Sequence, residues 1–168
     1  MPVLSLPALL GALSLPFALQ AAPPAAQPFD LAERTVVATF QGEGVQIYDC
    51  KAAPGGGASW TFREPIATLI ENGKTVGRHF AGPRWELEDG SLLQGRMARG
   101  EPGASSNDIP LLKLDVVSNA GPRVGQGRLA GVTTIYRLHT RGGMLKGGCT
   151  TPGERLSVLY SADYVFAR

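Results

Sequence analysis

The sequence predicts a single all-β domain, an antiparallel β-sandwich or barrel-like domain of roughly eight to ten strands. Three observations support this fold class. Short runs of apolar and polar residues alternate with the period of a strand. The 22 glycines and 13 prolines fall mostly between these runs, where turns are expected. No segment keeps a helical period, although residues 29–34 could form a single turn.

The predicted strands follow one another along the whole domain. Asn72 and Gly73 between two runs predict a hairpin with a type I′ turn. Asp89 and Gly90, also between two runs, predict a second hairpin of the same kind. Loops are expected over 100–108, 121–127 and 142–148 from their turn-forming composition. The predicted runs are 36–40, 45–50, 60–63, 67–71, 75–80, 85–88, 91–96, 111–117, 128–139 and 156–166.

The N-terminal residues predict export. Residues 1–21 have an apolar core followed by small residues, which is typical of a cleaved signal peptide, although a basic residue near the start is missing. Pro7 and Pro16 disfavour a permanent membrane helix, so we expect no integral membrane segment in the mature protein. The alternative interpretation of residues 1–21 is a buried apolar N-terminal helix. We expect residues 22–28 to form an Ala/Pro-rich tether and residues 29–168 to form the all-β domain. The expected location of the mature protein is periplasmic or extracellular.

The charge pattern gives no indication of nucleic-acid binding. The formal net charge is +2, and the 16 lysines and arginines are scattered along the chain. Only 96–99 and 137–141 approach a basic run, and neither has the stacking aromatic residues that such a surface uses.

The chain has two cysteines, Cys50 and Cys149. In an oxidising compartment the expectation for two cysteines is one disulfide. A metal-binding or catalytic pair is the alternative, but the chain lacks a Cys-x-x-Cys motif and a histidine at ligand spacing.

Candidate site residues concentrate in 79–91. His79 could act as an acid or base, with Glu86 or Asp89 to orient it, because its ordinary pKa is near neutrality. His79, Trp85 and Glu86 could instead bind a ligand. The structural alternative is also open: Trp85, in phase with Leu87, packs in the core, Glu86 is solvated, and Asp89 is a turn residue.

Other site classes receive no support from the sequence. His79 and His139 lie sixty residues apart, so no metal is expected. No phosphate-binding loop, dinucleotide fingerprint or nucleophile elbow occurs, and we expect no cofactor.

Three function hypotheses remain. The leading one is an exported, non-catalytic domain that binds a small molecule or an envelope or extracellular partner. The second is an enzyme that uses His79 with Glu86 or Asp89 as acid and base. The third is a structural, envelope-associated protein.

Ordered landmarks across the domain resemble a family of secreted bacterial and fungal proteins catalogued as domain of unknown function three-four-five-five. The matching landmarks are 44–50, 60–62, 79–86, 89–91, 140–143, Cys149 and 160–166. Leu111, where a tryptophan is expected, and Lys146, where a proline is expected, depart from the pattern. The resemblance implies secretion and a Cys50–Cys149 disulfide, and it implies no established activity.

Overall fold

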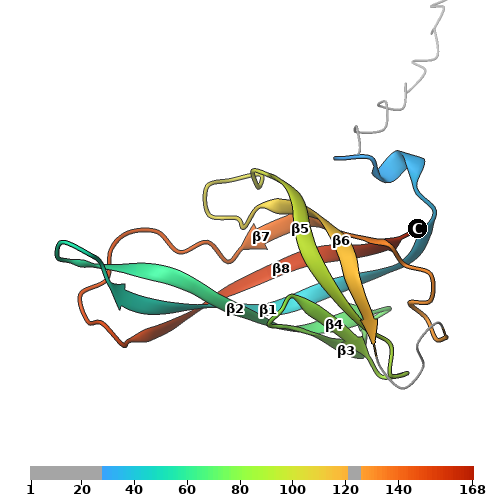
Figure 1. The fold of residues 1–168 in the computed structure, drawn as a ribbon, viewed down its shortest axis with the longest axis horizontal. Helices are drawn as coiled ribbons and strands as arrows, with labels where there is room; N and C mark the ends of the chain where they lie inside the picture. Colours follow the sequence, from blue (N-terminus) through green and yellow to red (C-terminus); the bar gives the residue numbers. More distant parts are fainter. Residues whose placement is uncertain (1–27, 121–125) are drawn as a thin grey trace, which may run out of the picture.

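The computed structural model describes residues 28–120 and 126–168, which form an eight-stranded antiparallel sheet closed into a barrel (Figure 1). Each strand pairs with the next along the chain, and β1 also pairs with β8, which closes the sheet. The predicted all-β antiparallel fold is therefore confirmed. The strands are β1 (Val36–Ala52), β2 (Ala58–Glu71), β3 (Lys74–Phe80), β4 (Arg84–Leu87), β5 (Leu92–Glu101), β6 (Leu111–Ala120), β7 (Thr134–Gly142) and β8 (Arg155–Ala167).

The ten predicted runs become eight strands because two pairs of runs are continuous. Runs 36–40 and 45–50 both belong to β1, and runs 60–63 and 67–71 both belong to β2. Gly42 pairs with Leu69 across β1 and β2 and does not form a turn. A Cβ atom on Gly42 would lie 2.5 Å from the ring of Tyr164, so glycine is needed for close approach inside the barrel.

The two predicted hairpins are both present, with different turn geometry. Asn72 and Gly73 both have positive φ, at 50° and 74°, as a type I′ turn requires. In the second hairpin Gly90 has a φ of 84°, and the Leu87 amide donates to the carbonyl of Ser91. The second connection is therefore a longer loop that uses one left-handed glycine.

Residues 126–133, the described part of the β6–β7 loop, close one end of the barrel. The predicted strand over 128–139 begins only at Thr134, because Arg128–Gly131 form a turn. Leu129 and Val132 in this loop bury their side chains in the core. The amide of Arg128 donates to Oδ2 of Asp89 at 2.8 Å, which fixes the loop against the β4–β5 connection.

Large apolar side chains fill the closed half of the barrel. Phe40 and Phe166 face each other with ring centroids 5.4 Å apart, and the side chains around them are almost fully buried. The other members of this packed core include Leu69, Leu87, Leu93, Leu129 and Ile135.

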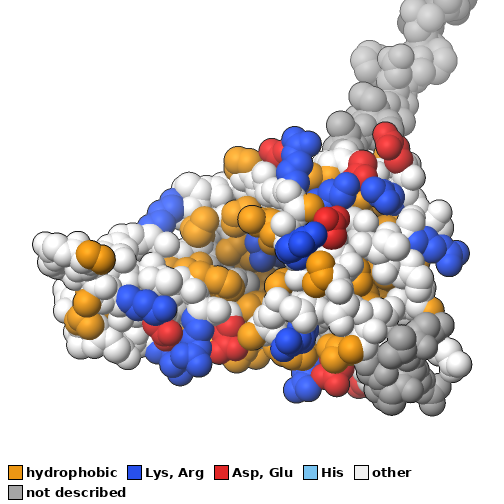
Figure 2. Space-filling model, in the orientation of Figure 1, with side chains coloured by type: hydrophobic (Ala, Val, Ile, Leu, Met, Phe, Trp, Pro, Cys, Tyr) orange, Lys and Arg blue, Asp and Glu red, His pale blue; other side chains and the backbone are white. Residues whose placement is uncertain are grey.

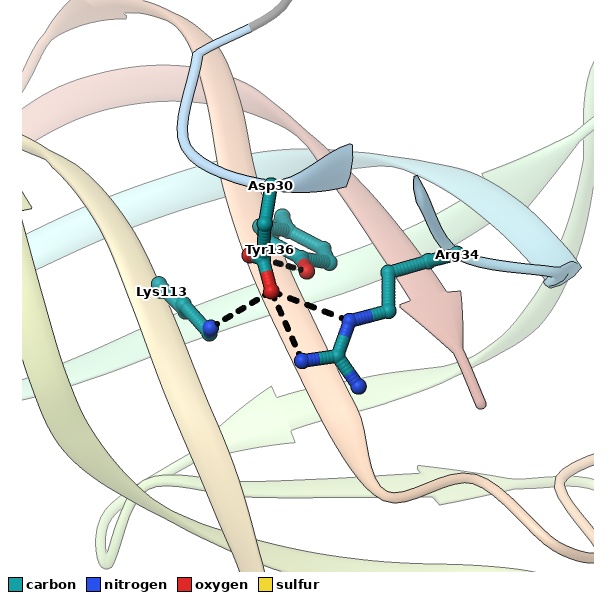
Figure 3. A network of polar contacts seen from close by, with 4 residues as sticks. All are labelled: Asp30, Arg34, Lys113 and Tyr136. Atoms are coloured by element: carbon teal, nitrogen blue, oxygen red, sulfur yellow. Dashed lines mark hydrogen bonds and ion pairs between the residues drawn. The ribbon is translucent and has the colours of Figure 1, made fainter. Parts of the chain in front are cut away.

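The N-terminal segment is fastened to the outside of the barrel. The single turn expected near its start is present as a 3₁₀ turn over Leu31–Glu33. Asp30 accepts hydrogen bonds from Arg34, Lys113 and the hydroxyl of Tyr136 (Figure 3). These partners hold the pKa of the Asp30 carboxyl far below its usual value.

The predicted leader over 1–21, and the tether up to residue 27, lie outside the described residues. Within the part of the chain that the structure describes, no helix is long and apolar enough to cross a membrane.

Cys50 and Cys149 form a disulfide with a Cα–Cα distance of 5.8 Å, which confirms the predicted bond. The bond joins the far end of β1 to the connection between β7 and β8. The amide of Cys149 also donates to the carbonyl of Ala58 at 3.2 Å. The long ends of β1 and β2 and the β7–β8 connection are thereby held together.

Removal of the disulfide should destabilise the protein. We expect the double variant Cys50→Ser, Cys149→Ser to lose about 2–5 kcal/mol of unfolding free energy, because the unfolded chain is no longer cross-linked. Urea denaturation of both proteins measures this difference. Reductant should lower the stability of the unmodified protein to that of the variant and leave the variant unchanged; equal stability of all four samples would contradict the prediction.

Candidate ligand-binding cavity

The half of the barrel away from the β6–β7 loop is hollow. A cavity of about 550 Å³ occupies it and reaches the surface as the hollow with hydrophobic walls in Figure 2. Its volume lies in the range of about 300–1,000 Å³ that small-molecule sites occupy. An eight-stranded barrel has an interior of this kind, wide enough to be filled by side chains or to hold one small ligand.

An aromatic layer forms the floor of the cavity. His79 on β3 and Trp85 on β4 are cross-strand partners, and their rings stack with centroids 4.5 Å apart at 14°. The ring centroid of Tyr164 on β8 lies 4.9 Å from that of His79 and 5.6 Å from that of Trp85. All three side chains are buried, and Trp85 and Tyr164 also belong to the packed core. The layer therefore divides the hollow half of the barrel from the packed half.

Apolar side chains form the walls and the mouth. Leu112 and Leu114 on β6 line one wall. Phe62, Met97 and Met144 line the cavity while remaining 50%, 63% and 37% exposed. A cluster of exposed apolar side chains around an opening is characteristic of a site that contacts an apolar molecule.

His79 is neutral and has a defined tautomer. Its Nδ1 lies 2.9 Å from the carbonyl oxygen of Arg84. Because a carbonyl only accepts, Nδ1 carries the proton and Nε2 is left as an acceptor. Burial lowers the pKa of His79 from 6.5 to about 3, so the ring stays uncharged at neutral pH.

Two buried donors at the cavity have no hydrogen-bond partner among the described residues. They are Nε2 of Gln46 and Nε1 of Trp85, whose side chains are 2% and 1% exposed. An unsatisfied buried donor costs roughly 1–3 kcal/mol, so such groups are uncommon unless something else satisfies them. The cavity also holds the side chain of Arg137, whose Nε donates to the carbonyl of Pro110 at 3.0 Å.

The structure brings together two of the four residues that the sequence singled out in 79–91. His79 and Trp85 meet on the cavity floor. Glu86 lies on the opposite face of β4, where its carboxylate accepts from Nε of Arg78 at 2.7 Å. Asp89 lies beyond the other end of β4, in the loop to β5 at the closed end of the barrel, and accepts from the amides of Ser91 and Arg128. Strand alternation separates Glu86 from His79, and the length of β4 separates Asp89 from it.

The sequence did not single out Arg137, Gln46 or Tyr164 as site residues. Arg137 carried a usable signal, because it is in phase with the buried Ile135 and is therefore a charged residue on an inward face. Tyr164 lies in the predicted run 156–166, but its contact with His79 depends on barrel closure, which pairs β8 with β1.

The arrangement is suited to binding more than to proton transfer. A histidine whose pKa is about 3 is a weak general base at neutral pH. What the floor offers is flat aromatic surface from His79, Trp85 and Tyr164. Among residues 28–120 and 126–168, no three His, Cys, Asp or Glu side chains cluster as a metal site would need.

His79 should make the stability of the protein depend on pH. The unfolded chain binds a proton at His79 near pH 6.5 and the folded protein only near pH 3, so stability falls as pH decreases between these values. From pH 7 to pH 5 this costs about 2 kcal/mol. The variant His79→Phe should lose about that much less over the same interval. Chemical denaturation at both pH values gives the comparison, and parallel losses for the two proteins would contradict it.

Comparison with known proteins gives one match. No curated protein and no solved structure is significantly similar to the chain. A family model described as "Protein of unknown function (DUF3455)" matches residues 31–168, which is most of the chain and all eight strands. The landmarks of the sequence had indicated the same family, and the chain is a member of the DUF3455 family of proteins of unknown function.

Proposed function

We propose that this protein is an exported, non-catalytic binding protein that holds a small, mostly apolar molecule in the open half of its barrel. The observation that carries the proposal is the cavity of about 550 Å³ above the His79–Trp85 layer. Its walls are mainly aromatic and aliphatic, and the polar side chain of Gln46 and the charged side chain of Arg137 also line it. Small-molecule sites combine these two features.

The hollow itself favours a binding role over a purely structural one. Protein interiors are close-packed, and an apolar wall without a neighbour loses its dispersion contacts. The packed half of this barrel shows that the chain fills space where it only needs stability. A purely structural role therefore does not explain the cavity in the other half of the barrel.

The acid–base enzyme is the weaker candidate. His79 is neutral with a pKa of about 3, and Glu86 and Asp89 are engaged elsewhere with Arg78 and with backbone amides. No carboxylate lines the cavity among the described residues. General acid–base catalysis needs a group of suitable pKa within hydrogen-bond reach of the reacting proton.

The export of the protein is part of the proposal. The Cys50–Cys149 disulfide is of a kind that persists in oxidising compartments, and the leader predicted over 1–21 supports delivery to the periplasm or the extracellular space. A binding site with an apolar mouth would there meet apolar molecules from the surroundings or from the envelope.

A cavity-blocking variant tests the binding function. The neutral fluorescent probe N-phenyl-1-naphthylamine should bind the purified, disulfide-intact protein with enhanced emission. Leu112→Trp, which projects a larger ring into the cavity, should weaken binding by about tenfold or more, since the probe loses its space. Excitation beyond tryptophan absorption keeps the added indole from contributing to the signal.

Val117→Trp is the matched control, because Val117 lies on the same strand with its side chain 49% exposed and outside the cavity. It should bind the probe as the unmodified protein does. Absence of binding to the unmodified protein, or equal affinity in Leu112→Trp, would refute the proposed site.

A further inference from the structure

We infer that the ligand of this cavity is an organic anion, an apolar molecule carrying one acidic headgroup that pairs with Arg137. The inference rests on the proposed function and specifies the class of ligand. It starts from the position of Arg137 on β7, in phase with Ile135, so that its side chain enters a cavity whose walls are mainly apolar.

The guanidinium of Arg137 is oriented without being neutralised. Its Nε donates to the carbonyl of Pro110 at 3.0 Å, which fixes the plane of the group. A hydrogen bond from Arg137 also acts on the pKa of the Tyr164 hydroxyl, a neutral partner that does not compensate the charge. None of the ion pairs between described residues involves Arg137, although other arginines of the barrel, such as Arg34 and Arg128, each hold a carboxylate. A half-buried, unpaired cation is costly, and an anionic ligand would relieve that cost.

The surroundings of Arg137 match an anion with an apolar body. Burial raises the pKa values of Tyr48, Tyr160 and Tyr164 and lowers the pKa of His79. In all four groups the charge of Arg137 also acts to lower the pKa, which places its guanidinium within electrostatic range of the cavity floor. A headgroup at Arg137 would leave the rest of the molecule against His79, Trp85 and the β6 wall.

The acidic headgroup fits better than a neutral acceptor for a geometric reason. A guanidinium offers paired N–H donors that match the two oxygens of a carboxylate or sulfonate. The carboxylates of Glu86 and Asp89 lie outside the cavity, so neither competes with the ligand for this position.

A pair of probes that differ by one charge tests the inference. 1-Anilinonaphthalene-8-sulfonate carries a sulfonate on the same anilinonaphthalene framework as the neutral N-phenyl-1-naphthylamine. We expect the unmodified protein to prefer the anionic probe, and higher salt to reduce this preference. In Arg137→Gln the preference should fall by about tenfold or more, toward equal affinities. Arg137→Lys, which keeps the charge but not the paired donors, should retain part of it.

Arg141→Gln is the matched control, because Arg141 lies on the same strand with its side chain exposed and outside the cavity. It should keep the preference of the unmodified protein. Equal affinity of both probes for the unmodified protein would overturn the anion inference and leave the binding function intact. Binding of neither probe would instead count against the binding function. If Arg137→Gln does not fold, the preference of the unmodified protein and of Arg137→Lys still decides the question.

Discussion

The stack of His79 on Trp85 is the interaction on which both halves of the barrel depend. Below it, Trp85 contacts Phe166 and continues the packed core; above it, the same layer is the floor of an open cavity. The stack forms because the two residues are cross-strand partners facing inward. The bond from Nδ1 of His79 to the Arg84 carbonyl fixes the tautomer of the imidazole, and burial keeps the ring neutral. A charged ring at this depth would be costly. One local pairing therefore sets the extent of the core and the shape of the site.

Much of the fold could be predicted from the sequence, and the errors have physical causes. Asn72 and Gly73 identified their hairpin because few other residues accept positive φ at both turn positions. Gly42 was misleading, since glycine marks both turns and close packing; here it makes room for Tyr164. Closure of the sheet rests on pairing between β1 and β8, at opposite ends of the chain, and local patterns do not report such a contact.

The site could be predicted only in part, for a related reason. The structural alternative, in which Trp85 packs inward and Glu86 is solvated, agrees with the structure for both residues. The sequence could not show that β7 brings Arg137 to the same space, because that depends on the curvature of the closed sheet. Asp89 illustrates the opposite case: a residue near His79 in the chain secures the closed end of the barrel through the amide of Arg128.

The central claim is that a ligand rests on the His79–Trp85 layer. The two tryptophans allow a direct test by ¹H–¹⁵N NMR, because each indole gives its own Nε1–H signal. Trp85 lines the cavity and its Nε1 is unsatisfied, whereas Trp60 on β2 pairs with Cys50 on β1 and lies outside the cavity lining. Titration with 1-anilinonaphthalene-8-sulfonate should shift the Trp85 signal in a saturable way and leave the Trp60 signal in place. A saturable shift of Trp60 with an unmoved Trp85 would contradict the account.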